Sequence, residues 1–194
     1  MRRRPAVFLD RDGTITVERG HIVRPEELEL VPGAAVAIAG LNRLGIPAVL
    51  VSNQSGVARG LMTEDDLARI HRRLEGLLAA EGASLDGAYY CPNLAGAAVE
   101  RYARDLSCRK PATGMIERAS RDLGVDVVAS YMVGDQLTDI ELAGNGGMKA
   151  VLVGTGKGAD ALEAVRERGL PLAHYAADLR EAVTWIVEDI GATA

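Results

Sequence analysis

The chain alternates between short apolar runs and longer segments in which apolar residues recur at helical spacing. The apolar runs cover residues 6–9, 46–51, 88–90, 127–133 and 150–153, with a further short run near residue 174. Continuous runs of this length are typical of strands that are buried on both faces of a parallel sheet. The helical segments cover residues 34–44, 63–78, 115–123, 140–143, 159–168 and 179–190. This alternation predicts an α/β fold, a three-layer α/β/α sandwich with a mostly parallel, Rossmann-like sheet.

Composition narrows the class of protein. The chain has 194 residues, of which 48% are hydrophobic and 25% are charged, and its net charge is -5. These values fit one globular domain over residues 1–194 and provide no basic surface for nucleic acid. No apolar run approaches the length of a membrane span. Two cysteines cannot build a disulfide framework, so we expect a cytoplasmic protein. We also expect a monomer with no nucleic-acid or membrane partner.

The polar residues after the first apolar run are the strongest chemical signal. Asp10 and Asp12 directly follow this run, and Gly13 comes next. A strand that ends in this way places both carboxylates at the carboxyl edge of the sheet, where open α/β folds bind ligands. Two carboxylates that lie close together repel each other unless a cation separates them, and Mg²⁺ suits such oxygen ligands. An ordinary polar turn is the competing interpretation.

Further polar residues follow other predicted strands or precede a helix: Ser52, Lys110, Asp135 and Asp139. Each has a bland interpretation as a helix cap or a solvated loop residue, but together they provide what phosphoryl transfer requires. Asp10 would attack phosphorus, and Asp12 would protonate the leaving oxygen and later activate water. Lys110 is one of three lysines among 22 basic residues, which favours a specific need for an ammonium group.

In order and spacing, these residues resemble the four motifs of the haloacid dehalogenase (HAD) superfamily. Within it, residues 8–15, 53–60, 89–92, 108–111 and 131–135 look like the D-glycero-D-manno-heptose-1,7-bisphosphate phosphatase group, which is related to the histidinol-phosphatases. The resemblance implies a HAD-like fold with a minimal cap and a phosphoaspartyl intermediate. It also implies Mg²⁺ held by Asp10, the main-chain carbonyl of Asp12, and Asp135. We expect Asp139 to lie behind these ligands.

The same resemblance assigns residues to the substrate. It implies that Lys110 holds the transferring phosphate with help from Ser52 and Asn53, and that Arg109 lies beside the leaving sugar. The other residues expected to contact substrate are Glu18, Arg19, Gly20, His21, Gln54, Ser55, Arg59 and Gln136. At Gln136 the group often has a lysine, so here a neutral amide replaces a charge that would help to hold a bisphosphate.

The chain departs from the group in the irregular segment 92–111. The group usually has a zinc loop in this region, with the pattern Cys-x-His followed by Cys-x-Cys. In this chain only Cys91 and Cys108 remain, and Asn93 and Leu106 occupy the other two positions. Because a structural zinc ion requires four strong ligands, we expect a degraded site without zinc, and a loop held by packing and hydrogen bonds.

Four functions are compatible with these motifs. The leading expectation is an Mg²⁺-dependent phosphatase that acts on a phosphorylated sugar and removes the C7 phosphate of D-glycero-D-manno-heptose 1,7-bisphosphate. Histidinol phosphate or another small phosphomonoester is the second candidate substrate. A non-catalytic phosphosugar-binding module is a candidate of another class, because fold does not fix function. A phosphoacceptor of the response-regulator kind is disfavoured by Asp12, which indicates turnover.

Overall fold

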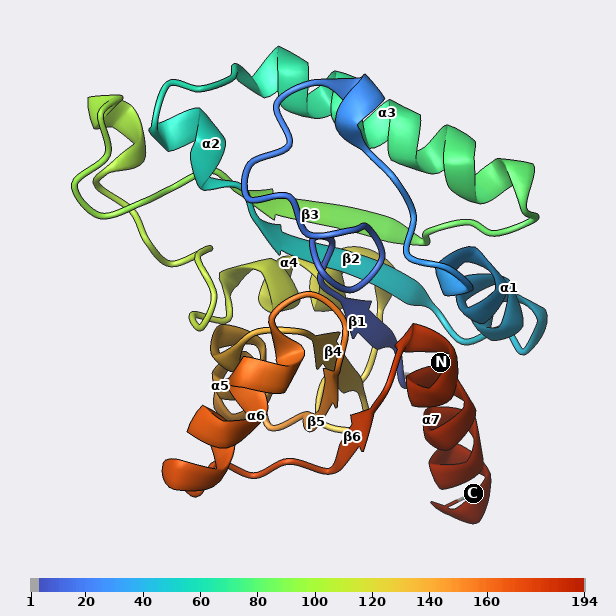
Figure 1. Cartoon of the computed structure of the whole chain (residues 1–194). Helices are drawn as coiled ribbons and strands as arrows, with labels where there is room; N and C mark the ends of the chain where they lie inside the picture. The colour runs from blue at the N-terminus through green and yellow to red at the C-terminus, as the bar shows by residue number, and fades with distance from the viewer. Residues whose placement is uncertain (1–3, 194) are drawn as a thin grey trace.

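Six parallel strands form one sheet in the computed structural model, which describes residues 4–193 (Figure 1). The ends of the expected domain, residues 1–3 and 194, lie outside this range. The strands are β1 (Val7–Leu9), β2 (Ala48–Asn53), β3 (Gly87–Cys91), β4 (Tyr131–Gly134), β5 (Lys149–Val153) and β6 (His174–Ala176). Their order is β3-β2-β1-β4-β5-β6, and each neighbouring pair is parallel. The predicted parallel sheet is confirmed.

Helices cover both faces of the sheet (Figure 1). One face carries α1 (Ala34–Arg43), α3 (Glu64–Ala80) and α7 (Leu179–Thr193), and the other carries α4 (Gly114–Leu123), α5 (Leu137–Gly146) and α6 (Gly158–Glu167). The three-layer α/β/α sandwich is therefore confirmed. None of the helices in residues 4–193 combines the length and the apolar character that crossing a membrane requires.

Some element boundaries differ from the prediction. β4 begins at Tyr131 rather than at residue 127, because Ser130 closes a turn by donating its amide N–H to the carbonyl of Val127. α5 extends on both sides of residues 140–143, since polar residues in its first turn hide the helical period. The short elements α2 (Ser55–Ala58), η1 (Pro25–Glu27) and η2 (Glu100–Tyr102) were not predicted, because so few residues carry no period.

The central strand β1 is buried on both faces. Val7 and Leu9 belong to the hydrophobic cluster on the α1 side of the sheet, and Phe8 belongs to the cluster on the α4 side. This alternation follows the two-residue period of a strand. Burial on both faces fixes the position at which Asp10 leaves the sheet.

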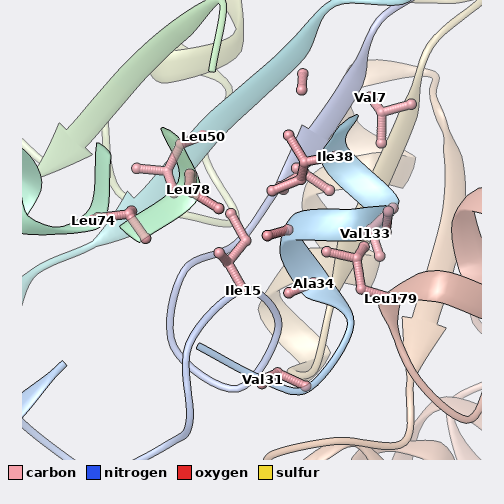
Figure 2. Packing of buried hydrophobic residues seen from close by; sticks show 14 of the residues in the cluster. Val7, Ile15, Val31, Ala34, Ile38, Leu50, Leu74, Leu78, Val133 and Leu179 are labelled. Carbon is pink, nitrogen blue, oxygen red and sulfur yellow. The ribbon is translucent and has the colours of Figure 1, made fainter. Parts of the chain in front are cut away.

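Ile15 ties the loop after β1 to the core. Its side chain is fully buried and lies between Ile38 of α1 and Leu50 of β2 (Figure 2). The amides of Ile15 and Thr16 donate to the carbonyl of Arg11 at 2.9 and 2.8 Å, which closes a tight turn around the two aspartates. Packing and hydrogen bonds together therefore hold the loop that carries Asp10 and Asp12.

The order of the strands reverses beside β1. The chain leaves β1 toward β2 and β3 on one side, and it later returns to β4, β5 and β6 on the other. At such a switch point, an open α/β sheet has a crevice beyond the carboxyl ends of its strands. Asp10 follows β1 and Asp135 follows β4, so the fold brings both residues to this crevice.

We expect Ile15→Ala to lower the free energy of unfolding by about 3 kcal/mol, because the shortened side chain leaves a cavity in the core. Val36→Ala is the matched control, since Val36 is 53% exposed on α1 and should change stability by less than about 0.5 kcal/mol. Urea denaturation followed by circular dichroism measures both values. Equal effects for the two variants would show that Ile15 does not anchor the loop.

Candidate active site

A buried lysine lies between two carboxylates beyond the carboxyl end of β1. Lys110 Nζ is 2.9 Å from Asp10 Oδ1 and 2.7 Å from Asp139 Oδ1, and it donates to the carbonyl of Val51 at 3.1 Å. Burial alone would lower the pKa of Lys110, but the charges of Asp10 and Asp139 raise it above its ordinary value. The amine therefore remains protonated and supplies a fixed positive charge.

Asn53 holds the main chain of Lys110 in place. Its side-chain Nδ2 donates to the Lys110 carbonyl at 3.2 Å, and its Oδ1 accepts the Lys110 amide N–H at 3.0 Å. Because Asn53 ends β2, these two bonds fix the lysine loop to the edge of the sheet. The carboxyl ends of β1, β2 and β4 are thereby joined at one point.

The acidic residues are not equivalent as metal ligands. Asp10, Asp135 and Asp139 bring carboxylate oxygens within 4.8 Å of one another. Asp139 uses both oxygens inside the protein, with Oδ1 on Lys110 and Oδ2 accepting a main-chain N–H at 3.0 Å. Asp135 accepts a main-chain N–H through Oδ2, while its buried Oδ1 has no hydrogen-bond partner among the described residues. This oxygen next to Asp10 fits a hard cation such as Mg²⁺.

The pKa values of the acids indicate the same need for positive charge. Burial raises the pKa of Asp135 to about 7 and that of Asp139 to about 6. The charge of Asp10 adds to both increases, whereas Lys110 opposes the increase at Asp139. Holding all these acids ionised in so small a volume is unfavourable unless a cation in addition to Lys110 neutralises them.

Two glycines leave room for the Asp135 carboxylate. Gly13 has a φ of +84°, and a Cβ atom on it would lie 2.0 Å from Asp135 Oδ2. A Cβ atom on Gly156 would lie 2.2 Å from the same oxygen. The main chain of both loops therefore packs directly against the carboxylate, which no larger residue would permit.

The carboxylates face a polar cavity of about 200 Å³. Most of the predicted residues line it: Asp10, Asp12, Glu18, Gly20, His21, Ser52, Asn53, Gln54, Ser55, Arg109, Lys110 and Gln136. Asp135 and Asp139 lie behind this surface and are fully buried. A small cavity with so many charged and hydrogen-bonding groups suits a compact, charged ligand.

Two of the predicted contact residues lie outside the lining. Arg19 is exposed and pairs with Glu29. Arg59 directly follows α2 and lies near Arg109. Burial lowers the pKa of Arg109, and the charge of Arg59 lowers it further. Two neighbouring guanidinium groups that repel each other favour an anion between them.

The sequence analysis did not select two lining residues, Thr138 and Lys157. Thr138 lies in the first turn of α5 and carries no signal that separates it from other helix residues. Lys157 follows the glycine-rich exit of β5, and its Nζ is 3.9 Å from Glu18 Oε2. It shares with Lys110 only the rarity of lysine in this chain, since Lys110 precedes a helix and was selected together with the superfamily motifs.

A disulfide joins the two cysteines of the degraded zinc loop. Cys91 ends β3 and Cys108 precedes Lys110 by two residues, and their Cα atoms are 5.5 Å apart. The expectation of a loop held by packing and hydrogen bonds alone is corrected, because the end of β3 lies close enough to the loop before Lys110 for the two cysteines to bond. In the disulfide neither sulfur is a free thiolate, so neither can serve as a zinc ligand in this form.

Comparisons with known proteins are consistent with this geometry. Residues 107–182 match the family model described as HAD-hydrolase-like. A Thermosynechococcus vestitus protein named D-glycero-D-manno-heptose-1,7-bisphosphate 7-phosphatase is 46% identical over 187 residues, which cover 94% of this chain and 95% of that protein. The Escherichia coli K12 D-glycero-beta-D-manno-heptose-1,7-bisphosphate 7-phosphatase is 43% identical over 155 residues, which cover 79% and 81% of the two chains.

A solved structure matches over nearly the full length. The D,D-heptose 1,7-bisphosphate phosphatase of B. bronchiseptica, complexed with magnesium and phosphate, has a TM-score of 0.83 and is 32% identical. The match covers 95% of this chain and 99% of that chain. Fold, site and relatives define a HAD-type phosphoric monoester hydrolase, and within that class the chain belongs to the heptose-1,7-bisphosphate 7-phosphatase family.

We expect Cys91→Ser with Cys108→Ser to leave the enzyme folded and active but less stable than the oxidised wild type by about 3 kcal/mol. The disulfide closes a loop with a sequence separation of 17, and its loss increases the entropy of the unfolded chain. Neither cysteine lines the cavity, so turnover should persist. Guanidinium denaturation and phosphate release measure the two effects.

Elemental analysis of the same samples tests the metal content of the loop. We expect far less than one zinc ion per chain in the wild type. Stoichiometric zinc that disappears in the double variant together with activity would contradict this description of the loop.

Proposed function

We propose that this chain removes the C7 phosphate of D-glycero-D-manno-heptose 1,7-bisphosphate, with Mg²⁺ as cofactor and a phosphoaspartyl intermediate on Asp10. The observation that carries the proposal is the buried pair of Asp10 and Lys110, 2.9 Å apart, at a cavity that Asp12 also lines. A carboxylate nucleophile beside a fixed cation is suited to accept a phosphoryl group. The names of the relatives support the sugar substrate.

The proposed reaction has two displacements at phosphorus. In the first, a carboxylate oxygen of Asp10 attacks phosphorus, the bond from phosphorus to the sugar oxygen breaks, and Asp12 gives that oxygen a proton. In the second, Asp12 takes a proton from water as the water oxygen attacks phosphorus, and the bond to Asp10 breaks. The products are the heptose 1-phosphate and inorganic phosphate, and both aspartates return to their starting states.

Fixed groups of the chain would balance the charge of the transferring phosphate. Lys110 would bind its equatorial oxygens, with the Ser52 hydroxyl and the Asn53 side chain beside it in the lining. Asp10, the main-chain carbonyl of Asp12, and Asp135 would hold Mg²⁺, with Asp139 behind them orienting Lys110. When bound, the ion supplies positive charge that screens the nucleophile from the phosphate oxygens.

Arg109 and Arg59 are suited to bind the second phosphate of a bisphosphate. Arg109 lines the cavity beyond Lys110, and its Nη1 donates to the carbonyl of Asn93 at 3.1 Å, which orients the guanidinium. Arg59 adds a second positive charge nearby. Gln136 and Lys157 provide further donors in the lining of the cavity. This distribution favours a substrate with two phosphates over histidinol phosphate, which has one.

We further propose that residues 1–194 function as one domain, as a cytoplasmic monomer without nucleic-acid or membrane partners. The net charge of -5 supports the absence of a nucleic-acid partner, and the continuous sheet supports a single domain. A non-catalytic phosphosugar-binding module would gain nothing from Asp12, whose side chain lies in the cavity beside the nucleophile.

Asp10→Asn should abolish turnover while leaving the fold intact, because an amide cannot form the acyl phosphate. Asp160→Asn on the exposed start of α6 is the control and should retain wild-type rates. Phosphate release from heptose bisphosphate, histidinol phosphate and common sugar monophosphates, with Mg²⁺ or with excess chelator, provides the measurement. Steady-state turnover by Asp10→Asn, or full wild-type activity in chelator, would refute the mechanism, and preference for histidinol phosphate would refute the substrate.

Arg109→Met should raise the KM for the bisphosphate about 30-fold, which corresponds to about 2 kcal/mol for a charge-assisted hydrogen bond. The same variant should change the KM for a sugar monophosphate little, because the group it loses would bind only the second phosphate. Arg168→Met, which removes an exposed ion pair with Glu141 on the outer helices, is the control. An equal loss for both substrates would place Arg109 at the transferring phosphate instead.

A further inference from the structure

A fully buried arginine lies between the two catalytic aspartates in the sequence and takes no part in the reaction described above. Arg11 is 0% exposed, although burying a guanidinium costs several kcal/mol unless its donors are paired. It does not line the cavity, so it does not contact substrate. Its role must therefore act through the groups that it touches.

The principal partner of Arg11 is the carboxylate of Asp12. Arg11 Nε donates to Asp12 Oδ1 at 2.9 Å, and Arg11 Nη2 donates to Asp12 Oδ2 at 2.9 Å. Two parallel bonds between a planar guanidinium and a carboxylate fix both the position and the plane of the acid. Thr16 Oγ1 adds a further hydrogen bond to Oδ1 at 3.2 Å.

Gln54 closes this arrangement from β2. Its Oε1 accepts a hydrogen bond from Arg11 Nη2, and its Nε2 donates to Asp12 Oδ2, both at 2.9 Å. The same Nε2 is 3.0 Å from Ser52 Oγ. Arg11, Gln54 and Asp12 thus form a closed triangle of hydrogen bonds, in which Gln54 is only 4% exposed. Gln54 also lines the cavity, where we expect it to contact substrate, so its amide can serve both the protein and the ligand.

The far side of Arg11 faces Tyr90. Burial raises the pKa of Tyr90, and the positive charge of Arg11 opposes the increase, while Arg11 Nη1 has no hydrogen-bond partner among the described residues. Tyr90 Oη is 2.8 Å from His71 Nδ1, and His71 Nε2 is 3.3 Å from Glu75 Oε1 on α3. The hydrogen bonds to Asp12 and Gln54 therefore hold the guanidinium on the side of the catalytic loop.

We propose that Arg11 and Gln54 are positioning residues for Asp12, which hold its carboxylate where it can protonate the leaving oxygen. The proposal rests on the proposed function, because it assumes that Asp12 is the general acid. A misplacement of about 1 Å in such a group can cost on the order of 100-fold in rate. A merely structural role for Arg11 would instead reduce every activity of the enzyme in proportion.

The dependence of the rate on the leaving group separates these two roles. A sugar alkoxide needs a proton as it departs, whereas nitrophenolate departs without one, so only the sugar ester requires a well-placed acid. Release of the leaving group in the first turnover, with enzyme in excess, reports the first displacement alone. We expect Arg11→Lys to slow this release about 100-fold for the sugar phosphate and less than about 5-fold for p-nitrophenyl phosphate.

Two further variants keep the test decisive. Gln54→Met removes the bonds to Asp12 with a side chain of similar size, and it should show the same selective loss even where Arg11→Lys fails to fold. In an Asp12→Asn background, Arg11→Lys should add no selective loss, because it acts through Asp12. Arg118→Lys is the control, since Arg118 is on α4 and its guanidinium lies over the ring of Tyr89 in β3, outside the cavity lining.

The outcomes distinguish the two claims. If the wild type releases neither leaving group, the proposed function and this inference both fail. If the wild type is active and Arg11→Lys or Gln54→Met slows both esters equally, the function stands and the positioning role is refuted. A selective loss that persists in the Asp12→Asn background would also refute it.

Discussion

The ammonium group of Lys110, buried between Asp10 and Asp139, is the interaction on which the site depends. Its three partners are Asp10 after β1, Val51 in β2 and Asp139 in the first turn of α5, which follows β4, so the contacts form only when these strands pair in the correct order. Removing one member of such a cluster leaves an uncompensated buried charge, which typically costs 3–5 kcal/mol. The same cluster therefore constrains the fold and prepares the charge distribution that phosphoryl transfer requires.

Much of this arrangement could be predicted from the sequence, because parallel strands end at one edge of a sheet. The apolar runs before Asp10, Ser52 and Asp135 identify the strands, and the polar residues after them then have to meet. The role of Lys110 was implied by the resemblance to the superfamily motifs. The rarity of lysine is a weaker signal, because Lys149 forms an exposed ion pair with Asp189.

Other features depend on contacts that no local pattern records. The start of β4 is set by a turn through Ser130, and the disulfide depends on the end of β3 meeting the loop before Lys110. Arg11 has the sequence context of a polar turn residue, yet it is fully buried because Asp12, Gln54 and Tyr90 surround it. Its burial is a property of the folded site, and the residues that cause it are up to 79 positions away in the chain.

The central claim is that Asp10 forms a covalent bond to phosphorus during turnover. Each in-line displacement inverts the configuration at phosphorus, so two successive displacements restore it. The most direct measurement is the configuration of the inorganic thiophosphate released from a phosphorothioate substrate whose transferred group carries sulfur, 16O and 17O, with hydrolysis in 18O-labelled water. The account predicts net retention at phosphorus, and net inversion would show that water attacks directly and that Asp10 is not the nucleophile.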